Sequence, residues 1–272
     1  MKQETRSVRF LYQTKAGRCC LKVLVQPWVS KIAGAYLSSC LSRPLVSAYV
    51  KKNKIDLSGY PQRKYSCFND FFTRQRNTDD ADTTPSHLIS PCDAYLSVYP
   101  IRDDSVYTIK HTQYRLDQLL DDPELAKHYA GGTCLIFRLT PMHYHRYCFS
   151  CSGKVAKCKR IDGKLHCVRP VAYTSIPVFT QNSREYVLIQ SEQFGKVVQM
   201  EVGALLVGKI KNHPVADAAQ QGKEKGYFEF GGSTIILLLE KDRVQIDPAF
   251  LTEPEVEKDV RYGMKIGVIC EK

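Results

Sequence analysis

Two glycines and a serine stand directly in front of a fully apolar segment, and this order of residues could support self-cleavage. Residues 225–242 read KGYFEFGGSTIILLLEKD. Because Gly232 has no Cβ, its carbonyl is open to attack by the Ser233 hydroxyl, and the backbone can reach a strained geometry there. Attack would turn the amide into an ester, elimination would break the chain, and hydrolysis would leave a ketone-bearing pyruvoyl group at position 233. Tight hairpin turns also use glycine, and the pattern alone favours a turn.

A second segment carries four potential metal ligands or nucleophiles within nine residues. Residues 139–153 read LTPMHYHRYCFSCSG, which gives the order H-x-H-x-x-C-x-x-C with His143, His145, Cys148 and Cys151. Such a group could bind zinc, although no second ligand pair follows at a familiar distance. A cysteine paired with a histidine could also act as a nucleophile. A zinc- or cysteine-dependent hydrolase is therefore one alternative function, and histidines with only a packing role are the ordinary structural alternative.

A carboxylate stands at the start of a predicted strand. Asp93 follows a Ser-Pro turn in HLISPCDAYL, residues 87–96. It could cap that turn, or it could orient a histidine as the third member of a catalytic triad. The pattern leaves both roles open.

The elements that must position these residues change in character along the chain. Apolar residues recur at helical spacing in segments 18–50 and 65–74. Pro27 and Pro44 divide segment 18–50 into short helices, and a further helix is expected over 65–74. A polar linker covers 76–86. Beyond it, runs rich in Val, Ile, Tyr and Thr predict strands, with one helical segment at 116–130. The expected strands are 95–99, 134–139, 154–159, 164–168, 185–190, 197–202, 205–211 and 234–240. The sequence thus predicts an α+β fold, in which N-terminal amphipathic helices precede a mainly antiparallel β body.

The positive charge is concentrated at the N-terminus. The formal net charge is +11, and residues 1–54 hold 11 of the 39 basic residues with Glu4 as their single acid. A basic amphipathic helix that contains Trp28 could lie in an anionic bilayer interface, or it could pack its apolar stripe on the body; the two interpretations have equal support. A non-enzymatic module that binds membrane or nucleic acid is a second alternative. Few aromatic residues and no nucleic-acid motif occur there, so no nucleic-acid partner is expected.

The cysteine content and hydropathy indicate the compartment. The chain has 11 cysteines, no apolar segment in its first 15 residues and no apolar run of 18 residues. These features predict reduced thiols, no signal peptide and no transmembrane helix. We expect a peripheral membrane protein on the cytoplasmic face of the cell membrane.

Taken together, these segments resemble the phosphatidylserine decarboxylase family. The resemblance rests on SPCDA (90–94), RLTPMHYHRY (138–147), VGALLVGKI (202–210) and GKEKGYFEFGGSTI (222–235), in this order and spacing. SRPLV (42–46) and FNDFFTR (68–74) are similar to the N-terminal portion of the family. The likeness runs from about residue 10 to residue 245.

The resemblance implies a proenzyme that cuts itself between Gly232 and Ser233. The products would be a β chain of residues 1–232 and an α chain of residues 233–272, which stay together as a heterodimer. Ser233 would become a covalent pyruvoyl cofactor, and no metal is implied. Its ketone would form a Schiff base with phosphatidylserine, release CO₂ and give phosphatidylethanolamine. Residues 1–80 would form a helical, basic, membrane-associating segment that meets phosphatidylserine and other anionic lipid, and residues 81–272 the catalytic domain. A homo-oligomer is compatible with the sequence, which does not specify one.

For self-cleavage the family uses an Asp–His–Ser arrangement, and Asp93 and Ser233 match its motif positions. The family motif Tyr-His-Arg-x-His has its first histidine at His145, whereas Cys148 occupies the second histidine position. The base could be His145, serving both cleavage and decarboxylation, or His143, or Cys148 as a thiolate. We expect His145 first and His143 second.

Overall fold

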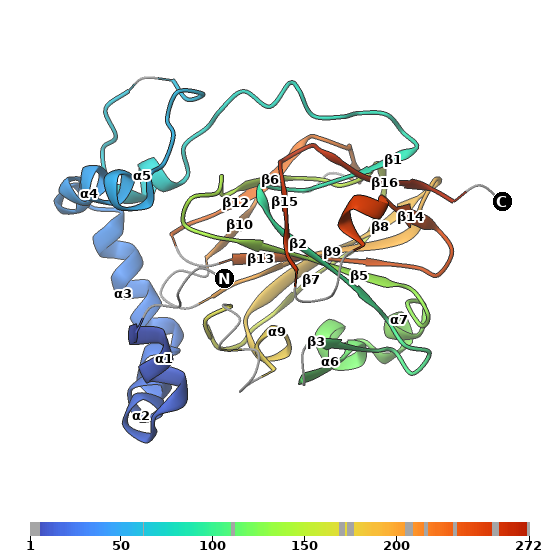
Figure 1. The fold of residues 1–272 in the computed structure, drawn as a ribbon, viewed down its shortest axis with the longest axis horizontal. Coiled ribbons are helices and arrows are strands. Elements are labelled where there is room, and N and C mark those ends of the chain that lie inside the picture. Colours follow the sequence, from blue (N-terminus) through green and yellow to red (C-terminus); the bar gives the residue numbers. More distant parts are fainter. Residues whose placement is uncertain are drawn as a thin grey trace.

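The computed structural model describes residues 6–61, 63–109, 112–168, 172, 177–204, 209–214, 217–230, 233–251 and 256–270. Helices occupy the N-terminal part and strands most of the remainder, so the expected α+β class with a mainly antiparallel β body is confirmed. The helices form an arm along one side of the β body (Figure 1).

Prolines set where two helices of the arm begin. The arm contains α1 (Arg6–Gln13), α2 (Lys15–Leu24), α3 (Pro27–Leu37), the 3₁₀ helix η1 (Cys40–Ser42), α4 (Pro44–Asn53) and α5 (Phe68–Phe72). Pro27 and Pro44 begin α3 and α4, because the first turn of a helix does not need the N–H that proline lacks. The predicted division of segment 18–50 into short helices at these prolines is confirmed. Thr14 caps α2 by accepting a hydrogen bond from the Gly17 N–H.

The apolar stripe of the arm is divided between the core and the surface. Leu21 and Val25 are buried in the main core, and the Leu165 N–H donates to the Val25 carbonyl at 3.2 Å. Trp28 and Ile32 of α3, by contrast, are 54% and 64% exposed. The packing interpretation is therefore confirmed for Leu21 and Val25, whereas attachment of the stripe to a bilayer stays a prediction. None of the described helices is long and apolar enough to span a membrane.

An eight-stranded antiparallel sheet forms the centre of the body, with the strand order β11-β7-β8-β9-β13-β5-β2-β15. Apolar clusters cover both of its faces. Its strands are β2 (Ala94–Pro100), β5 (Thr133–Leu139), β7 (Gly153–Ile161), β8 (Arg184–Ser191), β9 (Gly195–Val202), β11 (Ala218–Ala219), β13 (Ser233–Leu239) and β15 (Lys258–Val260).

Smaller elements surround this sheet. One three-stranded sheet contains β1 (His87–Ile89), β16 (Lys265–Ile269) and β14 (Val244–Ile246), and another contains β10 (Ile210–Asn212), β12 (Glu224–Phe228) and β6 (Arg146–Cys148). A two-stranded ribbon joins β3 (Val106–Ile109) to β4 (Thr112–Arg115). The short helices are α6 (Leu116–Leu120), α7 (Pro123–Lys127), α9 (Val178–Gln181) and η2 (Pro248–Phe250).

Strand β13 explains the apolar run that follows the Gly-Gly-Ser-Thr motif. It pairs with β5 on one side and with β9 on the other, and all of its residues are buried. Ile236 and Leu238 face one apolar cluster, whereas Ile235 and Leu237 face the other. A strand that is covered on both faces needs apolar side chains throughout instead of an alternating pattern.

The Gly-Gly-Ser-Thr motif was interpreted as a hairpin turn. This is wrong, because the strands before and after the motif do not pair with each other. Strand β12 pairs with β10 and β6 in a small sheet, whereas β13 belongs to the large sheet. Gly231 and Gly232 themselves lie outside the described residues. The motif therefore stands where the chain passes from one sheet to another.

Two further expectations need correction. Residues 164–168 do not form a strand and contribute only an isolated bridge between Lys164 and Asn182. Segment 116–130 forms two short helices because Pro123 cannot continue the first, and Asp122 caps the second by accepting from the Leu125 N–H. Of the strand expected over 205–211, residues 205–208 lie outside the described residues, and β10 covers its end.

Candidate active site

Ser233 stands at the first position of β13 and is fully buried. Its partner in the neighbouring strand is Leu139, the last residue of β5. The Ser233 Oγ makes no hydrogen bond with any described residue. A buried hydroxyl without a partner is costly, which makes Ser233 a candidate for a functional role. Gly232, whose carbonyl would be attacked, lies outside the described residues.

His145 comes from the segment that leaves β5 after Leu139. Its ring centroid lies 4.0 Å from that of Phe72 in α5, and neither ring nitrogen makes a hydrogen bond with a described residue. Burial lowers the pKa of His145 well below its usual range; the charges of Arg74 and His143 add to this effect, which a backbone interaction with His143 opposes. The ring is therefore neutral near pH 7 and keeps a lone pair that can accept a proton.

His143 is oriented by its own turn. The Thr140 N–H donates to Nδ1 at 3.1 Å, so the neutral ring carries its proton on Nε2. Nε2 lies 3.8 Å from Oδ1 of Asp259, and the ring packs edge-on against Tyr95. Because its acceptor nitrogen is already occupied, His143 is less suited than His145 to take a proton from a hydroxyl.

Asp93 is held by an arginine. Its carboxylate accepts two hydrogen bonds from Arg76, at 2.7 and 2.8 Å, and a third from the Tyr262 N–H at 2.9 Å. Burial lowers the pKa of Arg76, but Asp93 outweighs this effect and the net shift is upward. No histidine is among the described contacts of Asp93. The Asp–His–Ser arrangement implied by the resemblance stays a prediction.

Cys148 lies beside the turn that carries Asp93. Its N–H donates to the Pro91 carbonyl at 2.9 Å, and its Sγ lies 3.5 Å from the same oxygen. Burial raises the pKa of the Cys148 thiol to about 12. The thiol is therefore protonated at neutral pH, which disfavours Cys148 as a thiolate base.

The four potential zinc ligands have different neighbours. His143 accepts a hydrogen bond from Thr140, Cys148 lies against Pro91, and Cys151 is fully buried. Within the described ranges, no group of three or more His, Cys, Asp or Glu residues is arranged to hold a metal ion. These positions give the zinc alternative no support.

Two arginines next to these residues were not singled out from the sequence. Arg146 donates to Glu224 at 2.7 Å and to the Thr73 carbonyl at 2.8 Å. Arg74 is 2% exposed and close enough to His145 to lower its pKa. Both stand in the segments that carry the resemblance, which is the only signal in the sequence that could have identified them.

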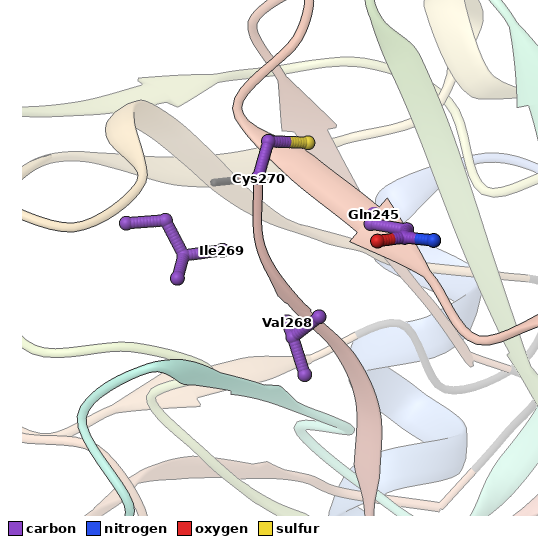
Figure 2. A pocket seen from close by; sticks show the side chains of 4 residues that line it. All are labelled: Gln245, Val268, Ile269 and Cys270. Atoms are coloured by element: carbon purple, nitrogen blue, oxygen red, sulfur yellow. The ribbon is translucent and has the colours of Figure 1, made fainter. Parts of the chain in front are cut away.

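The surface also has an open hollow (Figure 2). It runs along the strands β14 and β16 and is lined by Gln245, Val268, Ile269 and Cys270. It contains no predicted site residue and no charged side chain, so we do not assign it a part in the chemistry.

Residues 68–268 match the family model described as phosphatidylserine decarboxylase. Phosphatidylserine decarboxylase proenzyme 2 of Clostridium acetobutylicum is 42% identical over 265 residues, which cover 96% of this chain and 91% of that protein. The phosphatidylserine decarboxylase proenzyme of Ruminiclostridium cellulolyticum is 37% identical over 277 residues, with 98% and 92% covered. That of Clostridium perfringens is 36% identical over 270 residues, with 96% and 92% covered.

The state of Cys148 can be tested by alkylation of the folded protein with iodoacetamide at about pH 8. We expect the exposed Cys19, Cys20 and Cys158 to be modified, whereas the fully buried Cys148 and Cys151 react only after unfolding in urea. Peptide mass spectrometry measures the modified fraction of each cysteine. Modification of Cys148 in folded protein at the rate of Cys19 would restore the thiolate as a candidate base.

Proposed function

Because the chain belongs to the phosphatidylserine decarboxylase family, we propose that it makes its own catalytic group from Ser233 by breaking the bond between Gly232 and Ser233. The protein is a lyase that removes CO₂ from phosphatidylserine and leaves phosphatidylethanolamine; the family supports neither a hydrolase nor a non-enzymatic module. The observation that carries the proposal is the fully buried Ser233 hydroxyl, which has no hydrogen-bond partner among the described residues.

The proposed cleavage uses only the chain and water. The Ser233 oxygen bonds to the Gly232 carbonyl carbon, and the C–N bond between the two residues breaks. A base removes the hydroxyl proton while the Ser233 nitrogen gains one. Loss of the Ser233 Cα proton then breaks its Cβ–O bond and releases Gly232 as a carboxylate. Addition of water and loss of ammonia convert the remaining dehydroalanine into a pyruvoyl group.

The surroundings of Ser233 fit such a group. Ser233 and Thr234 are both fully buried, and neither hydroxyl has a partner among the described residues. The ring of Phe72 lies 4.0 Å from that of His145 and 5.2 Å from that of Phe230, and His145 is buried. A pyruvoyl ketone would supply an acceptor for the electrons that CO₂ leaves behind. Apolar surroundings favour this reaction because the departing carboxylate loses its charge.

His145 is our proposed base for the cleavage. Its ring is neutral, buried and without a hydrogen-bond partner among the described residues, and its segment begins at Leu139, which pairs with Ser233. Asp93 is the proposed orienting carboxylate. Direct contact with a histidine would require Asp93 to exchange its partner Arg76. His143 is the second candidate for the base.

The two fragments would remain together as a heterodimer. The α chain, from residue 233 onward, contains β13 to β16. Strand β13 pairs with β5 and β9, β15 pairs with β2, and β16 pairs with β1. All of these partners belong to the β chain, so cleavage would leave the sheets intact.

We further propose that the helical arm attaches the enzyme to an anionic membrane. Helix α3 exposes Trp28, Ile32 and Tyr36, and Leu41 beside it is 73% exposed. This segment lies within the basic first 54 residues. Apolar side chains flanked by lysine and arginine suit the interface of a bilayer, which also holds the substrate.

The cleavage is tested by mass spectrometry under denaturing conditions. We expect the wild-type chain to give two fragments, the smaller of which starts at position 233 with a ketone in place of an amine. The Ser233→Ala variant should stay whole and release no CO₂, because it lacks the attacking hydroxyl. Ser191→Ala, which also removes a buried serine hydroxyl, is the matched control and should cut normally. An intact wild-type chain that still decarboxylates phosphatidylserine would disprove the proposal.

The base is tested by scoring cleavage and CO₂ release separately in single variants. We expect His145→Ala to slow cleavage by about 10²–10⁴-fold, which is the usual contribution of a general base. His143→Ala and Cys148→Ala should still cut. Because the pKa of His145 is held well below its usual range, the rate of wild-type cleavage should not fall as the pH drops through about 6.5. A normal rate for His145→Ala, or an inactive Cys148→Ala, would reassign the base.

Membrane attachment is tested by sedimentation with vesicles of phosphatidylcholine and phosphatidylglycerol. Replacing Trp28 and Ile32 by serine should weaken binding at least roughly tenfold, because each large apolar side chain that enters a bilayer contributes about 1.5–3 kcal/mol. Leu251→Ser is the matched control, since Leu251 is 56% exposed but lies outside the arm. Equal binding of the wild type, the Trp28 and Ile32 double variant and Leu251→Ser would show that the arm is not the attachment surface.

A further inference from the structure

Arg74 is a buried cation with no acidic partner among the described residues. It follows α5 and is 2% exposed. Its guanidinium lies between two aromatic rings, 4.5 Å from the centroid of Tyr60 and 4.7 Å from that of Phe71. One terminal nitrogen, Nη1, donates to the Phe71 carbonyl at 3.3 Å. Nε and Nη2 have no hydrogen-bond partner in the described part of the chain.

The two unpartnered nitrogens form one complete edge of the guanidinium. Arg138 uses the same edge, Nε and Nη2, to hold both oxygens of Glu257, and Arg115 uses it to hold both oxygens of Asp117. Two parallel N–H donors match two oxygens of a single oxyanion. The corresponding edge of Arg74 is therefore preorganised for an anionic ligand with two equivalent oxygens.

This guanidinium lies close to His145 and to the segment that precedes Ser233. Arg74 is close enough to His145 for its charge to lower the pKa of that ring. His145 lies against Phe72, and Phe72 contacts Phe230, which precedes Ser233 by three positions. The neighbouring arginines are already engaged, since Arg76 holds Asp93 and Arg146 holds Glu224. A buried charge without a partner is strongly unfavourable, so an anion from outside the chain is the expected partner of Arg74.

We propose that Arg74 binds the phosphodiester of phosphatidylserine through its Nε and Nη2 edge and so fixes the lipid headgroup beside Ser233. This assignment rests on the decarboxylase function given above. The substrate carries a second anion, its carboxylate, which is the less suitable ligand. A cation held against the carboxylate would stabilise the charge that must disappear as CO₂ leaves, and so would raise the barrier. The phosphodiester keeps its charge throughout, so pairing with Arg74 assists binding without opposing the reaction.

The test separates substrate binding from turnover in single variants. We expect Arg74→Gln to cut normally at position 233, which reports on folding, and to raise KM for phosphatidylserine in detergent micelles at least about tenfold with little change in kcat. Arg74→Lys keeps the charge but not the parallel donors, and should fall between Arg74→Gln and the wild type. Arg63→Gln is the matched control, because Arg63 also lies over a ring, that of Tyr65, but its side chain is half exposed. Its KM should be unchanged.

A second measurement uses the wild-type enzyme and does not depend on the folding of a variant. Glycerophosphoethanolamine carries the phosphodiester without the carboxylate, and free serine carries the carboxylate without the phosphodiester. We expect only the first to compete with phosphatidylserine. Competition by serine alone, or by neither compound, would overturn the assignment, as would an Arg74→Gln variant with normal cleavage and an unchanged KM. A wild-type chain that stays whole would instead refute the proposed origin of the catalytic group.

Discussion

The pairing of β13 with both β5 and β9 is the constraint on which the rest of the site depends. It fixes the first residue of the strand, Ser233, beside the end of β5 with its side chain out of water. Strand β5 ends at Leu139, the residue that pairs with Ser233. The segment that carries both candidate histidines therefore begins next to Ser233 in the chain of β5. Burial on both faces also resists the separation of β13 from the sheet, because five large apolar side chains would have to enter water. A chain end created at position 233 would therefore stay in place.

A buried ion pair joins the small sheet to the large one just before this point. Lys225 of β12 donates to Glu201 of β9, and both side chains are fully buried. Lys225 also donates to Asn212, which in turn donates to Glu185. Burial raises the pKa of Glu201 although Lys225 opposes the shift. Removing one partner would leave an uncompensated charge at a cost of about 3–5 kcal/mol, so the pair keeps β12 in register with the large sheet.

The sequence was informative where the structure is local and uninformative where it depends on distant partners. The division of the arm at Pro27 and Pro44 and six strands of the large sheet, β2, β5, β7, β8, β9 and β13, follow from the pattern of apolar residues and were predicted. The short strands β1, β3, β4, β6, β14, β15 and β16 were not predicted. The sequence could not show that β12 and β13 do not form a hairpin, because the sheet that a strand joins depends on partners far along the chain. Of the site, Ser233 could be identified from its glycine neighbours and the family resemblance. Arg74 stands in a segment that carries the resemblance, but its proposed role could not be predicted, because its missing partner and its burial become visible only once Tyr60 and Phe71 enclose it.

Under the proposed function, the distribution of charge near His145 suits a decarboxylase of an anionic lipid. Its substrate has one charge that must vanish and one that must persist, and a uniformly positive pocket would hold both equally and hinder the reaction. Here Asp93 neutralises Arg76 and Glu224 neutralises Arg146, while burial keeps His145 uncharged. The aromatic rings of Phe72 and Phe230 add no charge. Among these described arginines and His145, the uncompensated positive charge is confined to Arg74, which under the proposed function leaves the remaining groups suited to the carboxylate that is lost.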